Sequence, residues 1–391
     1  MGKDRRLRVL WLCSWYPSAV EPFSGDFIQR HAESASLFAD IHVIHCTGST
    51  AVRQSWESRH ARRDGLTEWI GYYPKKGLVG RVMSPFAWWF MTMNLIKQFI
   101  SANGLPDLIH VHVPFKSGLV ARYLRWRYGI PYFITEHWGI YHRSASERFE
   151  HRSFLFRWLS RVAYNKAVFS ISVSAFQAKS LDTYFTPLPF LVVRNVVDTK
   201  LFTPNQHSSD LFTFIHVSDW SENKNPDGII RVFSRLHRKY PLIRLQLVGG
   251  KGVNEERIKI LSASIGTPIE LVGEVSYPEV AYCMKQADCF ILFSQMENSP
   301  CVIGEALCVG LHVIATDVGG VSELVDESGS QIVVAGDEVM LFNAMERAIH
   351  DRGFHDKKKI SEKFSQVFSY ESNGEKIVRA YDTVLGTTTL R

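Results

Sequence analysis

Two glutamates with seven residues between them stand in the most informative segment of the chain. Glu297 precedes Asn298-Ser299-Pro300, and Glu305 follows in an apolar run. Asn298 or Ser299 can cap a helix, and Pro300 fits its first turn, because the N–H that proline lacks has no helical partner there. The N–H groups of that turn and the helix dipole favour an anion or a hydroxyl group. The two carboxylates can therefore contact different parts of one extended ligand.

A simpler alternative is that Glu297 is a loop acid and Glu305 a solvated helix residue. The residues around Glu305 disfavour it, because Cys301–Gly304 before it and Ala306–Leu311 after it contain no charged side chain. A carboxylate in so apolar a helix needs a partner or a ligand. This favours a functional role for Glu305.

Three histidines lie on predicted strands of the first half or directly after them. His110 and His112 alternate on one face of a strand predicted at 108–113, and His137 follows a strand predicted at 132–136. Two histidines on one face suggest a metal site, but no third ligand stands at a matching spacing, so we expect no metal. His112 remains a candidate for substrate contact.

The elements that position these residues alternate between strand and helix along the chain. Apolar runs predict strands at residues 8–15, 40–46, 67–73, 108–113, 132–136, 168–173, 190–193, 213–217, 244–248, 269–272, 289–293, 312–316 and 331–334. Amphipathic segments between them predict helices, and this alternation is typical of parallel sheets covered on both faces.

A chain of 391 residues is long enough for two such domains. We expect an α/β fold with two Rossmann-like, doubly wound domains facing a central cleft, where ligands bind at the carboxyl ends of the strands. The predicted domains are 1–200 and 201–365, joined by a polar linker at 198–209. A final helix within 366–391 can pack back on the first domain.

The charge is distributed unevenly between these halves. Residues 1–200 hold 26 Lys and Arg against 14 Asp and Glu, whereas residues 201–391 hold 19 against 25. A basic first domain suits anionic lipid, a phosphorylated substrate or nucleic acid, but no nucleic-acid-binding motif accompanies the charge. We therefore expect no nucleic-acid partner.

An aromatic stretch in this basic half indicates a membrane surface. Phe86–Met91 contains Trp88 and Trp89 and is flanked by Arg81 and Lys97, as in helices that lie in a membrane interface. The alternative is a core helix with a solvated basic rim. We expect no signal peptide, and the 15 uncharged residues at 82–96 are too few to span a bilayer. The spacing of the six cysteines favours reduced thiols in a cytosolic protein.

The motifs together resemble those of the retaining glycosyltransferases of family 4, which have the GT-B fold. The resemblance rests first on Glu297 and Glu305 with the segments 310–316 and 318–323 that follow them. It covers nearly the whole chain, because weaker motifs follow in the expected order at 15–18, 25–28, 107–112, 135–137, 172–174, 195–198, 247–249 and 271–273.

The resemblance implies a role for each matching residue. Glu305 would accept hydrogen bonds from the ribose of a nucleotide-diphosphate sugar, and Glu297 would hold a sugar hydroxyl. Lys224 would neutralise the diphosphate, and His137 would face the anomeric centre. Further donor contacts are expected from Gly25, Val275, Asn298, Ser299, Cys301 and Val302.

One position departs from the family pattern. An arginine is expected a few residues before Lys224, but Asp219 or Trp220 stands there. Loss of this cation would weaken leaving-group stabilisation. Two alternatives therefore stay open, a non-catalytic nucleotide-sugar-binding relative and another sugar-nucleotide enzyme on the same fold, such as an epimerase.

The expected function is transfer of a sugar, with retention of configuration, from a nucleotide-diphosphate sugar to a glycan or lipid-linked acceptor. Neither a metal nor another cofactor is implied. The basic first domain should hold the acceptor through His112, Trp88 and Trp89. We expect a cytoplasmic enzyme, peripheral on the inner face of the cytoplasmic membrane, that acts in the synthesis of cell-surface polysaccharide or glycolipid.

Overall fold

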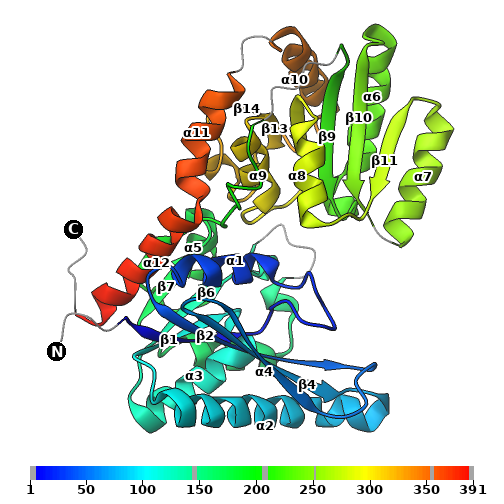
Figure 1. The fold of residues 1–391 in the computed structure, drawn as a ribbon. Coiled ribbons are helices and arrows are strands. Elements are labelled where there is room, and N and C mark those ends of the chain that lie inside the picture. The colour runs from blue at the N-terminus through cyan, green and yellow to red at the C-terminus, as the bar shows by residue number, and fades with distance from the viewer. Residues whose placement is uncertain (1–5, 143–147, 205–209, 251, 353–355, 387–391) are drawn as a thin grey trace. The chain divides into compact units, whose positions relative to one another are not determined.

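The computed structural model of the chain describes residues 6–142, 148–204, 210–250, 252–352 and 356–386, which form two compact units (Figure 1). The first unit comprises Met1–Arg194 with Tyr370–Arg391, and the second comprises Asn195–Ser369. The chain enters the second unit before residue 200, because the backbone N–H of Val197 donates to the carbonyl of Phe368 over 3.0 Å. Of the predicted linker, residues 205–209 lie outside the described residues.

The first unit is built on an eight-stranded sheet in the order β3-β4-β2-β1-β5-β6-β7-β8. Its strands are β1 (Arg8–Cys13), β2 (Asp40–Ser49), β3 (Trp56–Arg63), β4 (Leu66–Pro74), β5 (Leu108–His112), β6 (Tyr132–Glu136), β7 (Phe169–Ser172) and β8 (Phe190–Val192). Its helices are α1 (Asp26–Ala35), α2 (Gly77–Asn103), α3 (Pro114–Tyr128), α4 (Phe154–Tyr164), α5 (Ala175–Leu181) and α12 (Tyr370–Val384). All strand pairs are parallel except β3 with β4.

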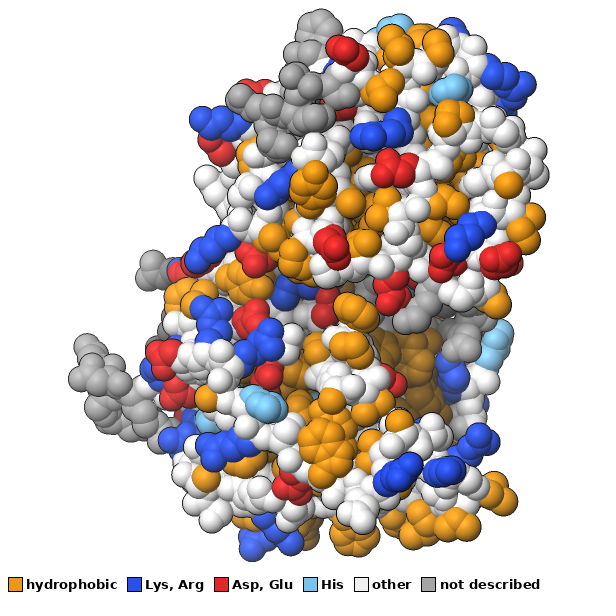
Figure 2. All heavy atoms as spheres, turned by 45° about the vertical axis from the view of Figure 1, so that its right-hand side comes forward, with side chains coloured by type: hydrophobic (Ala, Val, Ile, Leu, Met, Phe, Trp, Pro, Cys, Tyr) orange, Lys and Arg blue, Asp and Glu red, His pale blue; other side chains and the backbone are white. Residues whose placement is uncertain are grey.

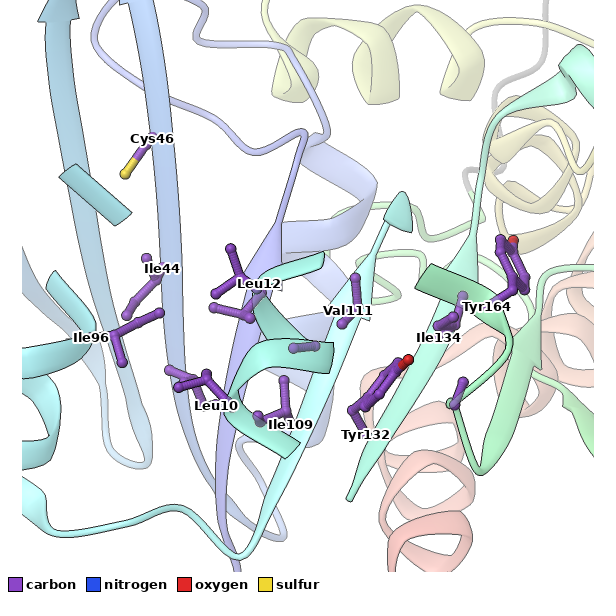
Figure 3. Packing of buried hydrophobic residues seen from close by; sticks show 14 of the residues in the cluster. Leu10, Leu12, Ile44, Cys46, Ile96, Ile109, Val111, Tyr132, Ile134 and Tyr164 are labelled. Atoms are coloured by element: carbon purple, nitrogen blue, oxygen red, sulfur yellow. The ribbon is translucent and has the colours of Figure 1, made fainter. Parts of the chain in front are cut away.

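Apolar side chains fill the space on both faces of this sheet. On one face, α2, α3 and α4 pack over the strands, and Figure 3 shows Leu12, Ile44, Val111 and Ile134 of four strands in that layer, together with Ile96 of α2. On the other face, α1 and α12 bury residues such as Ile28 and Ile377. Each fully buried large aliphatic side chain contributes about 1.5–3 kcal/mol. The sheet therefore holds its strand ends in fixed positions.

The second unit contains a six-stranded parallel sheet in the order β11-β10-β9-β12-β13-β14. Its strands are β9 (Phe212–Ser218), β10 (Ile243–Gly249), β11 (Ile269–Gly273), β12 (Cys289–Leu292), β13 (His312–Thr316) and β14 (Ser330–Val333). Its helices are α6 (Pro226–Lys239), α7 (Val253–Ile265), α8 (Tyr277–Lys285), α9 (Cys301–Val309), α10 (Glu338–His350) and α11 (Lys357–Phe368). The prediction of two doubly wound α/β domains is confirmed.

Strand β3 was not expected from the sequence. Its residues are almost all exposed and include four cations or histidines, so it lacks the apolar alternation of a half-buried strand. The strand pairs with β4 in antiparallel register, and Trp56 stacks on Tyr72 with ring centroids 3.7 Å apart. A partner strand, rather than an apolar face, therefore holds β3 in place.

Helix α2 differs from the sequence expectation for its two tryptophans. Trp88 is only 8% exposed and belongs to the core under the sheet, and Trp89 is half-buried, with its ring centroid 6.1 Å from that of Tyr123. This corrects the prediction that Trp88 contacts the acceptor or a membrane, because its indole packs inward. Among the described residues, no helix has both the length and the apolar character needed to cross a bilayer.

Candidate active site

Two loops at the carboxyl ends of neighbouring strands bring Lys224 and Glu297 together in the second unit. Lys224 precedes Asn225, whose side chain caps α6, and Glu297 follows β12. The Lys224 ammonium donates to Glu297 Oε1 over 2.6 Å, and the Ser294 hydroxyl donates to the same oxygen over 2.6 Å. Glu297 is 7% exposed. A cation and a carboxylate are thus fixed side by side in a largely buried position.

The backbones of the two loops are also linked. Gln295 N–H donates to the carbonyl of Asn223 over 2.8 Å, and the Asn223 side chain donates to the carbonyl of Met296 over 2.9 Å. These bonds span more than 70 residues of chain, so the position of Lys224 depends on the loop that carries Glu297.

Gly319, in the loop after β13, lies directly against the Glu297 backbone. Its φ is +59°, and a Cβ there would lie 1.8 Å from the Glu297 carbonyl oxygen. The positive φ and the contact both require glycine. The glycine of the Val318–Glu323 motif therefore supports the Glu297 loop.

We expect Gly319→Ala to lower the free energy of unfolding by more than about 3 kcal/mol and to displace Glu297. The matched control is Gly336→Ala, because Gly336 has a φ of +78° but open space where its Cβ would lie. The control should lose only the backbone cost of about 1 kcal/mol. Urea unfolding measures both values. Equal losses for the two variants would show that the contact with Glu297 has no effect.

Glu305 lies at the middle of α9 and is 3% exposed. The Tyr277 hydroxyl at the start of α8 donates to Glu305 Oε1 over 3.1 Å. Burial argues against the solvated-residue alternative, because a buried carboxylate needs hydrogen-bond donors. Sequence reasoning missed Tyr277 and Ser294, although Tyr277 stands two residues after the candidate Val275.

The start of α9 differs from the expected cap. Pro300 occupies the N-cap itself, Cys301 is the first helical residue, and no side chain caps the helix. The carbonyl of Ser299 accepts a hydrogen bond from the Asn195 side chain over 2.7 Å, which holds the loop that also contains Asn298.

The remaining donor candidates of the second unit are Val275, Cys301 and Val302. Val275 and Val302 are partly buried and pack against the same apolar cluster, and Cys301 is partly exposed. Cys301 and Val302 therefore lie in the first turn of α9, and Val275 packs against the apolar cluster to which this helix contributes.

The structure gives different environments to Asp219 and Trp220, the two residues near the position of the expected arginine. Trp220 is fully buried in the core with a φ of +56°, and its ring covers Gly250. Asp219 is exposed and accepts a hydrogen bond from the Ser221 hydroxyl over 2.8 Å. Trp220 thus has a packing role, and Asp219 is the residue that stands where the cation is expected.

Two candidate residues of the first unit, His137 and His112, lie side by side. His137 Nε2 lies 3.2 Å from Nδ1 of His112, and the two rings stack with centroids 5.5 Å apart. Phe27 and His31 of α1 lie 4.9 Å and 5.9 Å from the His137 ring. Burial lowers the pKa of His137 well below 6.5, helped by the nearby His31 and His110. His137 is therefore neutral at pH 7 and can take part in hydrogen bonds without a charge.

His112 is fully buried and stacks on Trp11, with ring centroids 4.2 Å apart. This corrects the prediction that His112 contacts the acceptor, because the imidazole is covered and its hydrogen bond positions His137. His110 lies between the Tyr381 and Thr135 hydroxyls, each 2.7 Å away, and so joins α12 to the sheet.

Gly25 caps α1 and has a φ of +71°. A Cβ there would lie 2.8 Å from the carbonyl carbon of Trp15 and 2.9 Å from the N of Tyr16. The glycine is therefore required by its own neighbouring loop, whatever ligand binds. Trp15 in turn packs edge-on against Trp138, beside His137.

Glu136, which precedes His137, was not recognised from the sequence. One carboxylate oxygen accepts the backbone N–H groups of His137 and Trp138 over 2.9 Å each, and the other accepts the Tyr164 hydroxyl over 3.3 Å. Burial raises the pKa of Glu136 to about 7, against these hydrogen bonds and that of Tyr141. The carboxylate holds the turn that presents His137.

Glu136→Gln should change how stability depends on pH. The folded protein binds a proton at Glu136 up to about pH 7, and the unfolded chain only up to 4.5. The stabilisation by this proton is complete below pH 4.5 and is lost as the pH rises through 7. From pH 5 to pH 8 the wild type should therefore lose about 2–3 kcal/mol of its free energy of unfolding through this group. The variant lacks the group, so over the same range its free energy of unfolding should rise by that amount relative to the wild type. Urea unfolding at both pH values measures this.

The matched control for this prediction is Glu150→Gln in the same unit. Glu150 is exposed and also accepts a tyrosine hydroxyl, that of Tyr184, over 2.9 Å. Glu150→Gln removes one exposed carboxylate with a similar hydrogen bond and so serves as the reference for the pH series. A Glu136→Gln variant that behaves in the same way as this reference would contradict the buried, titrating carboxylate.

Two family models match the chain, one in each half. The glycosyl transferase 4-like domain matches residues 29–195, and glycosyl transferases group 1 matches residues 197–366. The TuaC glycosyltransferase of Bacillus subtilis, named for teichuronic acid biosynthesis, is 25% identical over 379 residues, which are 88% of this chain and 90% of that protein.

Two further proteins are similar over different lengths. A phosphatidylinositol N-acetylglucosaminyltransferase component of Arabidopsis thaliana is 25% identical over 204 residues, 51% of this chain but only 45% of the plant protein. The solved structure of Anabaena HepE in complex with UDP has a TM-score of 0.72 and 16% identity, and covers 96% of this chain and all of that one. The chain is therefore a GT-B glycosyltransferase that joins a glycosyl transferase 4-like first half to a second half of the glycosyl transferases group 1 family.

Proposed function

We propose that this glycosyltransferase binds a nucleotide-diphosphate sugar on its second unit and transfers the sugar with retention of configuration and without a metal. The observation that supports this best is the ion pair of half-buried Lys224 and buried Glu297, 2.6 Å apart, on the unit that also buries Glu305. A fixed ammonium can stabilise the negative charge that develops on a departing diphosphate, which is a task that metal ions perform in other transferases.

In this proposal, Glu305 and Glu297 each contact one part of the donor. Glu305 accepts the ribose hydroxyls, while the Tyr277 hydroxyl keeps its carboxylate in place. Lys224 and Ser294 both donate to Oε1 of Glu297, so we assign Oε2 to a hydroxyl of the sugar. When the diphosphate binds, the Lys224 ammonium donates hydrogen bonds both to Glu297 and to the phosphate oxygens.

The chemical step needs no nucleophilic residue in this proposal. The bond between the anomeric carbon and the phosphate oxygen breaks as the acceptor oxygen attacks from the same face. The acceptor's proton passes to the departing phosphate. His137 contributes a neutral imidazole, held by His112, that donates to a sugar hydroxyl or to the leaving oxygen.

The acceptor that we propose is a glycan or a lipid-linked glycan, used in the synthesis of cell-surface polysaccharide or glycolipid at the inner face of the cytoplasmic membrane. One relative is named for teichuronic acid biosynthesis and another carries phosphatidylinositol in its name, which supports this class. All six cysteines are free thiols, in agreement with a reducing compartment.

Two measurements test the proposal. Thermal unfolding with UDP-, GDP-, ADP- and CMP-sugars should show stabilisation by one nucleotide class. With that donor, water can serve as a slow acceptor, and proton NMR in the first minutes should show the free sugar with the anomeric configuration of the donor. Release of the opposite anomer would overturn retention. No stabilisation by any donor would overturn the donor site, and loss of donor cleavage in EDTA would overturn metal independence.

A further inference from the structure

Three helices of the first unit form one layer with a single sign of charge. Helices α2, α3 and α4 cover the same face of the sheet and turn their outer sides away from it. None of the three contains Asp or Glu. Their cations are Arg81, Lys97, Lys116, Arg122, Arg125, Arg127, Arg157 and Arg161. Such a layer attracts an anionic surface.

The same layer exposes large apolar side chains. On α2, Leu78, Val82, Phe86 and Phe90 are 58–78% exposed and follow one another at intervals of four residues. This spacing forms one stripe about 18 Å long on the outer side of the helix. Figure 2 shows apolar side chains beside Lys and Arg along the lower edge of the molecule, where α2 runs in Figure 1.

The other two helices of the layer also expose large apolar side chains. Phe154, Leu155 and Trp158 of α4 are 50–74% exposed, and Trp126 of α3 is 78% exposed. So many large exposed apolar side chains on three helices of one layer are uncommon on proteins that contact only water. Its combination with cations is typical of surfaces that insert into the interface of an anionic bilayer.

A groove between α3 and α4 lies within this surface. It has a volume of about 620 Å³ and is lined by Arg122, Arg125 and Lys166 together with Trp126 and Trp158. Arg125 donates to the carbonyl of Lys166 over 2.6 Å, which holds one guanidinium at the wall of the groove. Guanidinium groups beside indole rings suit a phosphate with a hydrocarbon chain attached to it.

We propose that the α2–α3–α4 face is a membrane-docking surface, on which the stripe of α2 enters the interface of an anionic bilayer and the α3–α4 groove receives a phospholipid headgroup. The proposal deepens the proposed function, because it rests on that function for the membrane-linked acceptor and names the surface that reaches it. Lipid binding by this face needs neither donor nor acceptor. The docking proposal and the proposed function can therefore fail independently of each other.

Sedimentation of the full chain with vesicles tests the proposal. The wild type should bind vesicles of 30% phosphatidylglycerol in phosphatidylcholine and only weakly vesicles of phosphatidylcholine alone. Phe86→Ser with Phe90→Ser should weaken binding about 100-fold, because two exposed aromatic side chains leave the interface. Arg122→Gln should weaken binding several-fold and reduce its dependence on salt.

The matched control carries Ile260→Ser and Tyr282→Ser on the second unit. These residues are 62% and 65% exposed, close to the values for Phe86 and Phe90. The control should bind anionic vesicles like the wild type, and all variants should cleave the donor in solution at the wild-type rate. Donor cleavage that fails in the wild type would count against the proposed function alone.

Four results would overturn docking on the membrane. The first is equal binding of the wild type to both kinds of vesicle, and the second is equal vesicle binding by the α2 variant and the control. The third is a stable dimer in solution that the α2 substitutions dissociate, because the stripe would then be an interface between two copies of the chain. Retention of RNA in preference to vesicles would likewise assign the cations to another partner.

Discussion

Replacing Lys224 by alanine should lower kcat by about 100- to 1000-fold, the effect of removing one preorganised group that stabilises charge in a transition state. The reason is the position of its ammonium, which lies 2.6 Å from Glu297 in a largely buried site. In the proposed reaction this is the cation that meets the departing diphosphate, and exposed Asp219 stands where a second is expected. Donor cleavage at saturating donor measures the loss.

The control for Lys224 is another lysine of the same unit. Lys259 also lies 2.6 Å from a glutamate, Glu255, but on the exposed surface of α7. Lys259→Ala should leave kcat unchanged. Lys224→Arg keeps the charge and should fall between wild type and alanine. If Lys224→Ala stays folded in urea titrations and retains its kcat, the assignment of the leaving-group cation is wrong.

Replacing Glu305 by alanine should remove the stabilisation of the protein by its nucleotide donor. A ligand at a hundred times its dissociation constant adds about 2.7 kcal/mol to the folded state. For a unit the size of Asn195–Ser369 this is a rise in melting temperature of about 5–10 °C. The variant should show no such rise, because the carboxylate that accepts the ribose hydroxyls is gone. Thermal unfolding with and without donor measures the difference.

Two variants separate ligand binding from a general effect on the fold. Glu346→Ala removes a carboxylate that also accepts a tyrosine hydroxyl, that of Tyr240 over 2.9 Å, and should respond to the donor like the wild type. Tyr277→Phe keeps Glu305 but removes the hydroxyl that donates to its Oε1, so it should lower donor affinity only several-fold. A normal thermal shift in Glu305→Ala would contradict the ribose role.

Much of the strand pattern could be predicted from the sequence, because strands buried on both faces consist of apolar runs with few competing interpretations. The strands predicted at 132–136 and 312–316 have those bounds in the structure. Strand β3 could not be found in this way, since it is exposed and charged and depends on its pairing with β4. A cross-strand partner leaves no periodic pattern in the sequence.

Candidate site residues could be predicted from the sequence where a motif, or a charged residue in an apolar segment, indicated a function. Through the family resemblance of its motifs, the sequence predicted a glycosyltransferase with two α/β domains and named Lys224, Glu297 and Glu305 as candidates for contact with a charged, hydroxyl-rich ligand. Ordered motifs and an acid in an apolar helix are properties of the chain alone, and no folding is needed to detect them.

Only the tertiary structure decided which side chains face inward and which groups they meet. Trp88 and Trp220 lie in cores, and His112 supports His137 where a substrate contact was expected. Tyr277 became visible only through its bond to Glu305, 28 residues away. Burial and long-range hydrogen bonds depend on how helices pack on sheets, and residues far apart in the sequence determine that packing together.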